Sequence, residues 1–345
     1  MRDQDIADLI TMTLSKVGKG RFERIAQQLN DYEVMSRLLN KNGMFGGVQE
    51  IDGGKSIKEQ LMTEKGSAFR WVGLYDKDSV NVTEYMTEME VNWCHATTNM
   101  AYERREILEN RGEQRINNII VPRRVGMMLD VADRLEDNFF SAPVAGNTKE
   151  PWGLPYWIVK NSAQGFNGGA PSGFTTVGGV DPTVYPTFQN YTDSYAAVSK
   201  EDLIRKLRRA HFYTRWKSPV SAKEFRSETG QRRRIFTNYD TLAAMEEIGE
   251  AQNENLGRDL APYDGEITFR RHAIRAIPKL DDDPTNPVYM IDLATFKLFV
   301  LKGDYLRESD AKPAPFQHNV FVVHVDLTYQ TMCVNRRANA VLYVA

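Results

Sequence analysis

The 345-residue sequence lacks several features that would indicate a class of function at once. It contains no run of about 18 apolar residues, the length that a transmembrane helix needs, so no membrane span is expected. The first residues, MRDQDIADLITMTL, place acidic side chains where a secretory signal has basic ones. We therefore expect a chain that is intracellular when it is made.

The sequence has few cysteines and a small net charge. The two cysteines, Cys94 and Cys333, lie far apart and match no ligand spacing for zinc or an iron–sulfur cluster, so they are expected to be reduced thiols. The 44 basic residues nearly balance the 46 acidic ones, which leaves a net charge of -2. The overall charge therefore gives no reason to expect tight binding to nucleic acid.

Motifs for catalysis or cofactor binding are also missing. The stretch GGVQEIDGGKS resembles a phosphate-binding loop, but Gln49 stands where the motif requires glycine. No two of the five histidines form the i, i+4 pair of a metal-binding helix, and no G-x-S-x-G or dinucleotide motif occurs. The acidic run 281–283 precedes Pro284 and predicts a solvated turn, without the ligand spacing of an EF-hand. We predict no catalytic residue, no cofactor and no metal ligand.

The elements that are present have a distinctive order. Residues 3–40 have the periodicity of short amphipathic helices, which must dock on another surface because short helices are marginal alone. The stretch FRWVGLYDKDSVNVTEYM (69–86) predicts a hairpin with its turn at 76–79. Apolar residues at three- and four-residue spacing predict a long helix over 111–140, bent at Pro122.

The second half of the chain begins with an unusual segment. Residues 141–198 are rich in Gly, Pro, Thr and aromatics, which predicts an ordered but irregular surface segment rather than a disordered linker. Helices are expected over 199–216, with a cap at Ser199 and Asp202, and over 240–255, capped by Asp240 or Thr241. Strands are expected in the stretches 233–239, 267–280 and 286–303, the last with a short helical turn. The final stretch, 318–345, predicts two neighbouring strands joined by a turn at Asn335-Arg336-Arg337.

Two stretches mix arginine with aromatic residues, LRRAHFYTRW and QRRRIFTNY. This composition occurs where proteins bind single-stranded nucleic acid. It also occurs at protein interfaces, where arginine pairs with carboxylates, and this chain has many carboxylates. The protein interface is the favoured reading.

Taken together, these parts resemble a tailed-bacteriophage major capsid protein with the Hong Kong 97-type (HK97-like) fold. The stretch FRWVGLYDKDSVNVTEYM is similar to the extended loop (E-loop) of that family, and RGEQRINNIIVPRRVGMMLDVADRLEDNFF is similar to its spine helix. HVDLTYQTMCVNRRANAVLYV is similar to the terminal strands, and runs such as ERREILENRG, PWGLPYWIVKN, EAQNENLGRD and LKGDYLRE resemble one capsid subgroup. The resemblance covers nearly the whole chain and is clearer after residue 40.

The resemblance implies an α+β fold with four parts. These are an N-terminal arm (1–45), an extended loop (46–90), a peripheral domain with the spine helix (91–140 and 301–345), and an axial domain (141–300) that includes the insertion 141–198. Segment 141–198 is longer than a minimal axial domain requires, and the lysine–asparagine cross-link of some family members cannot be placed here.

The function that the resemblance implies is structural and not enzymatic. The chain would self-assemble as pentamers and hexamers into an icosahedral shell around the double-stranded DNA genome, without sequence-specific contact to the DNA and without a membrane. Scaffolding, portal and decoration proteins are possible partners, and the protein would be made in the bacterial host cytoplasm and located in the virion. The expected contacts between subunits are made by Phe69, Trp71, Tyr75, Tyr85, Arg336 and Arg337.

Two other functions remain open at this point. The first is an encapsulin-like nanocompartment shell, which has the same fold but encloses enzymes. The second is a nucleic-acid-binding protein that acts through the arginine–aromatic stretches, and salt-dependent retention on DNA would support it.

Overall fold

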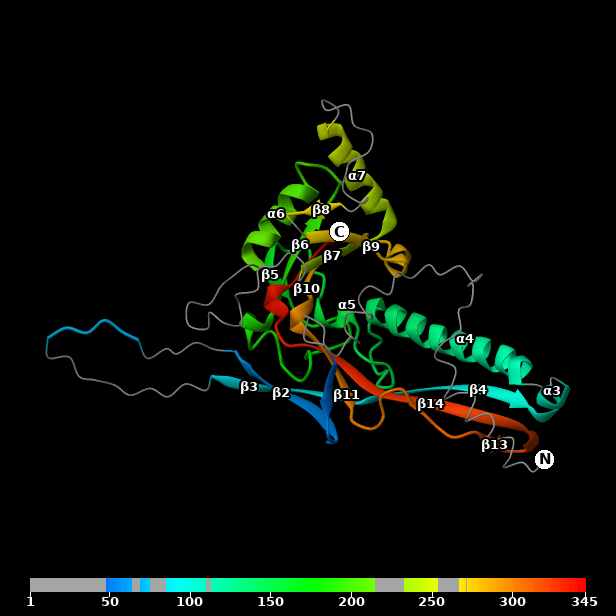
Figure 1. The fold of residues 1–345 in the computed structure, drawn as a ribbon. Coiled ribbons are helices and arrows are strands. Elements are labelled where there is room, and N and C mark those ends of the chain that lie inside the picture. The colour runs from blue at the N-terminus through cyan, green and yellow to red at the C-terminus, as the bar shows by residue number, and fades with distance from the viewer. Residues whose placement is uncertain are drawn as a thin grey trace.

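The computed structural model describes residues 48–63, 69–74, 85–109, 113–214, 233–253, 267–270 and 272–345. The predicted N-terminal arm, Tyr75 and the predicted turn at 76–79 lie outside this range. The described chain forms two β-sheets, one long helix beside the first sheet, and a two-stranded ribbon that leads to a projecting loop (Figure 1).

A six-stranded sheet is organised around one long strand, β14 (Gln317–Cys333). β4 (Cys94–Glu103) pairs antiparallel with β14 over ten residues along one edge, and β11 (Phe296–Leu301) pairs with β14 along the other. The remaining strands extend this second side; they are β1 (Val48–Ile51), β12 (Arg307–Glu308) and β13 (Lys312–Ala314). β14 alternates buried Phe321, Val323 and Val325 with less buried residues, the pattern of a strand with one face in the core.

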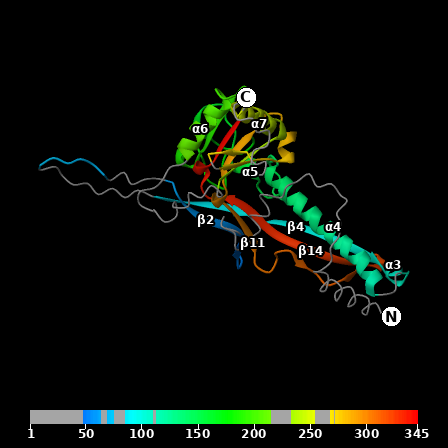
Figure 2. The ribbon, with the colours of Figure 1, turned by 45° about the horizontal axis from the view of Figure 1, so that its top comes forward.

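The long helix predicted over 111–140 is confirmed as α4 (Glu113–Phe140), which contains Pro122 and follows the short helix α3 (Arg104–Glu109). A 28-residue α-helix is about 42 Å long at 1.5 Å per residue. Met127 of α4 packs with Met100, Tyr102 and Phe321 of the sheet. The helix therefore lies along β4 and β14 and covers one face of the six-stranded sheet (Figures 1 and 2).

A second, seven-stranded sheet has the order β5-β6-β15-β10-β7-β9-β8. Its strands are β5 (Gly165–Gly168), β6 (Asn190–Tyr195), β7 (Arg233–Thr237), β8 (Thr268–Phe269), β9 (His272–Ala276), β10 (Val288–Asp292) and β15 (Ala340–Val344). α6 (Leu203–Thr214) and α7 (Tyr239–Asn253) both cover one face, because Leu207 of α6 and Met245 of α7 share a core cluster with Met290.

Segment 141–198 is ordered and largely irregular, with a short helix α5 (Leu154–Trp157) and a 3-10 turn η2 (Pro186–Phe188) besides β5 and β6. The prediction that it lies on the surface is wrong. Trp157, Ile158 and Val177 are fully buried in the cluster that also contains Phe139 of α4 and Phe296 of β11. The segment forms part of the hydrophobic core between the two sheets, which explains its many aromatic residues.

The two sheets are joined by two adjacent strand crossings. β10 continues through the 3-10 turn η5 (Leu293–Thr295) into β11, and β14 continues through η6 (Arg336–Ala338) into β15. β10 pairs with β15 in one sheet, and β11 pairs with β14 in the other. The prediction that β14 and β15 are neighbouring strands of one sheet is therefore wrong, because the turn between them carries the chain from one sheet to the other.

Of the local predictions, three are wrong and one is confirmed. The paired hairpin strands are β2 (Ser56–Met62) and β3 (Met86–Asn92), so the stretch from 69 onward belongs to the connection between them. The stretch 267–280 forms two short strands with a turn at Arg270. The Ser199 and Asp202 cap is confirmed, since the Ser199 hydroxyl accepts a bond from Asp202 N–H at 3.1 Å. The cap of α7 is instead Asn238, whose side chain accepts a bond from Thr241 N–H.

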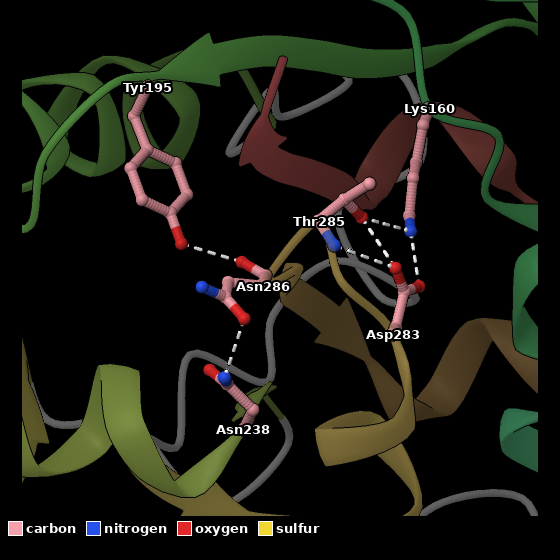
Figure 3. Close-up of polar contacts among 6 residues, drawn as sticks. All are labelled: Lys160, Tyr195, Asn238, Asp283, Thr285 and Asn286. Carbon is pink, nitrogen blue, oxygen red and sulfur yellow. Dashed lines mark hydrogen bonds and ion pairs between the residues drawn. The ribbon is translucent and has the colours of Figure 1, made fainter.

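The acidic run 281–283, at the end of η4 (Pro278–Asp282), is only partly solvated, because Asp283 is half-buried. Figure 3 shows the contacts of Asp283 and its neighbours. The Asp283 carboxylate accepts hydrogen bonds from the Lys160 ammonium and from Thr285. Asn286 has the left-handed φ of 43°, its carbonyl accepts a bond from Tyr195 Oη at 2.6 Å, and its side chain accepts one from Asn238 at 2.9 Å. Hydrogen bonds thus link the turn to β6 and to the start of α7. The Lys160 ammonium pairs with the Asp283 carboxylate, the group that a calcium ion would need as a ligand.

Candidate interaction surface

The connection between β2 and β3 holds a group of four strongly exposed apolar side chains within six residues. Phe69, Trp71 and Leu74 are 80%, 90% and 92% exposed, and Val72 is also exposed. The rings of Phe69 and Trp71 contact each other edge to face, with centroids 5.5 Å apart. In Figure 1 the described residues 69–74 lie far beyond the ends of β2 and β3. No surface of the described chain covers these side chains.

The base of this loop, in contrast, is fixed to the body. Ile57 and Met89 are buried in the main core, and Lys297 forms an ion pair with Glu59 at 2.8 Å. Glu90 N–H donates to the carbonyl of Gly178 at 3.0 Å. Gly178 has φ +58°, and a Cβ there would lie 2.7 Å from Met89 Cγ, so only glycine lets the two segments approach this closely.

The structure separates the six predicted contact residues. Phe69 and Trp71 lie on the exposed loop, and Tyr85 lies at its end, 38% exposed, next to β3. Tyr75 lies outside the described residues. The contact prediction also missed Leu74 and Val72, because it counted aromatic residues and ignored the aliphatic members of the same run.

The prediction that Arg336 is exposed at a subunit edge is wrong. Its side chain is fully buried, and its guanidinium donates to the carbonyls of Trp157, Gly168 and Gly169 and to Asn190 Oδ1. The guanidinium also lies 5.0 Å from the ring centroid of Phe188. Burial lowers the pKa of Arg336 to about 10. Arg336 therefore holds segment 141–198 against the crossing turn, and no ion pair links it to a carboxylate within the described part of the chain.

Arg337, the next residue, is exposed. Its guanidinium lies over the ring of Phe166 in β5, 3.8 Å from the centroid. Of the two arginines in the turn, only Arg337 is accessible to a neighbouring molecule.

The crossing turns are locked by a second polar group. Asn339 Oδ1 accepts a bond from Asp292 N–H at 2.8 Å, and its amide donates to Thr295 Oγ1 at 3.0 Å and to the carbonyl of Asn335 at 2.9 Å. Asn339 is fully buried, so these bonds are made away from water and fix the two turns side by side.

The groups that could perform chemistry are occupied or buried. Burial raises the pKa of Cys94 to about 11 and that of Cys333 to about 12, so neither is a reactive thiolate. A shallow hollow contains His95, Thr328 and Asp304, which are joined by hydrogen bonds, next to the paired Arg307 and Asp326. Across the described ranges no group of three metal-binding side chains is close enough to hold an ion. Gly53 and Gly54 of GGVQEIDGGKS lie between strands β1 and β2, so a strand follows them and no helix N-terminus is present there for a phosphate.

Among the helices that the structure describes, none is long and apolar enough to cross a membrane. No protein-family model matches the sequence, and no curated protein matches it.

The fold does match solved structures over nearly its whole length. The capsid asymmetric unit of cyanophage A-1(L) is similar at a TM-score of 0.61 and 12% identity, covering 94% of this chain and 96% of that one. The capsid of a native GTA particle is similar at 0.59 and 12% identity, covering 95% of each chain. The capsid of Myoviridae phage XM1 is similar at 0.52 and 12% identity, covering 96% of this chain and 98% of that one. The chain therefore has the α+β capsid fold that the sequence predicts.

Proposed function

We propose that this chain is a tailed-bacteriophage major capsid protein that assembles as pentamers and hexamers into an icosahedral shell around double-stranded DNA. The observation that carries the proposal is the likeness to capsid subunits over 94% of the chain. The role is structural, and the protein would be located in the virion.

The exposed loop gives this proposal a physical basis. Apolar side chains such as Trp71 and Leu74 gain nothing from standing in water, so a loop that holds them far from its own core needs a partner surface. In a shell made of one protein, the surface available to every loop is a neighbouring copy. Buried tryptophan is a frequent hot spot of interfaces, and we assign that part to Trp71.

The domains that we propose follow the two sheets. Residues 1–45 form the N-terminal arm, and β2, β3 and their connection form the E-loop. The six-stranded sheet with α4 is the peripheral domain. The seven-stranded sheet with α6 and α7 is the axial domain, and β15 belongs to it instead of to the peripheral domain. Asn339 and Arg336 lie where the two domains meet.

The proposed contact with the genome is not sequence-specific. A chain with a net charge of -2 has no excess of cations to bind DNA phosphates, so packaged DNA would not be held tightly on the wall. Scaffolding, portal and decoration proteins are further proposed partners.

The test is to produce the protein alone and together with the proteins encoded beside it, and to image the product by electron microscopy. Closed particles that contain DNA in the presence of the packaging proteins are the expected result. Particles that enclose an enzyme would instead favour a nanocompartment shell. A protein that stays monomeric under all these conditions would contradict the proposal.

A further inference from the structure

The two helices on the seven-stranded sheet carry opposite charges. α6 has the sequence LIRKLRRAHFYT, with four basic residues and no acidic one. α7 has the sequence YDTLAAMEEIGEAQN, with four acidic residues and no lysine or arginine. The whole chain is nearly neutral, so this separation is local.

The basic residues of α6 face outward. Arg205, Arg208 and Arg209 are exposed, together with Phe212, which is 74% exposed, and Tyr213. Arg205, Arg208 and Phe212 follow the i, i+3, i+7 spacing of one helix face.

Arg205 and Arg208 have no acidic partner among the described residues, whereas Arg209 interacts electrostatically with the buried Asp193. The acidic residue just before α6, Asp202, is already paired with Lys206 at 2.5 Å. Within the described ranges no ion pair links Arg205, Arg208 or Arg209 to a carboxylate.

The acidic residues of α7 also face outward. Asp240, Glu246 and Glu247 are exposed beside the exposed ring of Tyr239, and none of the three carboxylates has an ion pair with another described residue. The neighbouring turn η4 adds the exposed Asp281 and Asp282, although Lys279 neutralises Asp282 at 2.8 Å.

The two charged surfaces lie toward opposite ends of the strand order. We call them the α6 flank (Arg205, Arg208 and Arg209) and the α7 flank (Asp240, Glu246, Glu247 and Asp281). α6 packs over β6 and β15 near one end of the strand order, whereas α7 packs by β9 near the other. Figures 1 and 2 show α6 and α7 toward opposite edges of the seven-stranded sheet. One copy can therefore present its basic flank to a second copy while its acidic flank is still free.

From this arrangement we infer that the α6 flank of one copy docks on the α7 flank of the next, head to tail, and that this contact closes the pentamers and hexamers. The inference rests on the proposed shell function and names the surfaces that build its rings. A contact between two different flanks of identical subunits is heterologous, and it generates a ring when its rotation closes. Opposite charges set the register of such a contact and disfavour α6 against α6 or α7 against α7.

The test reverses each flank in the full chain. Arg205→Glu with Arg208→Glu makes both flanks acidic, and Asp240→Lys with Glu246→Lys and Glu247→Lys makes both flanks basic, because the three lysines outnumber the acidic residues that remain. Each variant alone is expected to lose ring and particle yield at least tenfold, roughly what 1.4 kcal/mol gives. The variant with all five substitutions has complementary flanks again and is expected to recover the yield.

A mixture of the two single-flank variants gives a sharper result. Every favourable contact then joins one variant to the other, so rings must alternate and must contain an even number of subunits. Six-membered rings are expected and five-membered rings are not, so the mixture should form flat or tubular arrays and no closed shells by electron microscopy. The control is Lys149→Glu with Lys312→Glu, which makes the same charge change as the α6 variant at exposed sites away from both flanks and should leave yield unchanged.

Other outcomes overturn the inference in distinguishable ways. If the reversed variants form shells like the unchanged chain, the flanks do not pair, while the shell function stands. The same holds if the five-substitution variant does not recover. If reversal of α6 only lowers retention on DNA at low salt, that flank binds nucleic acid instead. If the unchanged chain forms no rings under conditions that include its scaffold, the proposed function and this inference fail together.

Discussion

The buried turn around Arg336 and the exposed loop around Trp71 both break the rule that apolar groups are inside and charges outside. Arg336 is a charge with no exposed surface, and Trp71 is a large apolar side chain that is 90% exposed. The two side chains differ in where the groups that they contact lie. Arg336 donates to four oxygens of its own chain, whereas the ring contact of Trp71 among the described residues is with its loop neighbour Phe69.

This difference assigns the two regions to different stages. A buried group whose hydrogen bonds are made within the chain contributes to folding, because its environment exists only in the folded monomer. An apolar group left in water by the folded monomer contributes after folding, when another molecule covers it. Substitutions should therefore change stability at the turn and assembly at the loop.

The largest effect on stability is expected for Arg336→Ala. The substitution leaves a cavity and removes the donor from the carbonyls of Trp157, Gly168 and Gly169, so the free energy of unfolding should fall by about 3 kcal/mol or more. Urea denaturation measures it. Arg337→Ala is the matched control and should cost about 0.5 to 1 kcal/mol, the value of an exposed cation–π contact. Equal losses for the two variants would contradict the assignment of Arg336 to the core.

The next largest effect is expected for Trp71→Ala, in assembly. Loss of a hot-spot tryptophan costs about 2 kcal/mol or more per contact, so shell yield should drop steeply. The urea midpoint should stay the same, because the Trp71 side chain is 90% exposed in the folded chain. Val144→Ala, another exposed apolar residue but outside the loop, should change neither quantity. Normal shells from Trp71→Ala, or from a chain without residues 69–86, would show that the loop is not an assembly contact.

How much of this could be read from the sequence depends on how local each feature is. The long helix over 113–140 and the cap at Ser199 depend on neighbouring residues, and both were predictable. The burial of Arg336 depends on carbonyls more than 140 residues away, from a segment whose composition suggests a surface loop. The sheet to which β15 belongs depends likewise on pairing with β6 and β10, which adjacency to β14 in the sequence conceals.

For a related reason, the sequence indicates that the loop makes a surface contact but does not indicate where its paired strands lie. Its aromatic run indicates a surface contact, but the run lies beyond the paired strands, because β2 starts at Ser56, before the stretch that has the strand-like composition. Opposite charge on α6 and α7 is visible in the sequence, yet only the strand order places the two helices on opposite flanks.

An effect on stability smaller than that of Arg336→Ala is expected at Gly178, which links the two regions because it anchors the loop base to segment 141–198. Gly178→Ala adds a Cβ 2.7 Å from Met89 Cγ at a residue with φ +58°, so strain and overpacking should together cost about 2 to 3 kcal/mol in the free energy of unfolding. Gly179→Ala has φ +81° but 3.7 Å to its nearest neighbour, so it should cost only the strain, about 1 to 2 kcal/mol. Calorimetry of the two variants measures the difference. Equal costs would mean that Met89 moves aside and that the base is less tightly held than the turn.

The smallest effect is expected at Asp283, a partly exposed charge between the extremes of Arg336 and Trp71. Burial alone would raise its pKa, but hydrogen bonds from Lys160 and Thr285 outweigh burial and hold the pKa below its usual value of 3.8. A carboxyl group with a lowered pKa stabilises the fold above that value, and its contribution is lost as the pH falls through the folded pKa. Asp283→Asn should thus cost about 0.5 to 1 kcal/mol at pH 7, as expected for a partly exposed pair, and the difference from the unchanged chain should shrink below pH 3.8. Asp282→Asn is the control, because Asp282 is more exposed and pairs only with Lys279, so it should cost less. A cost for Asp283→Asn that stays constant down to pH 3 would mean that its hydrogen bonds, and not its charge, hold the turn.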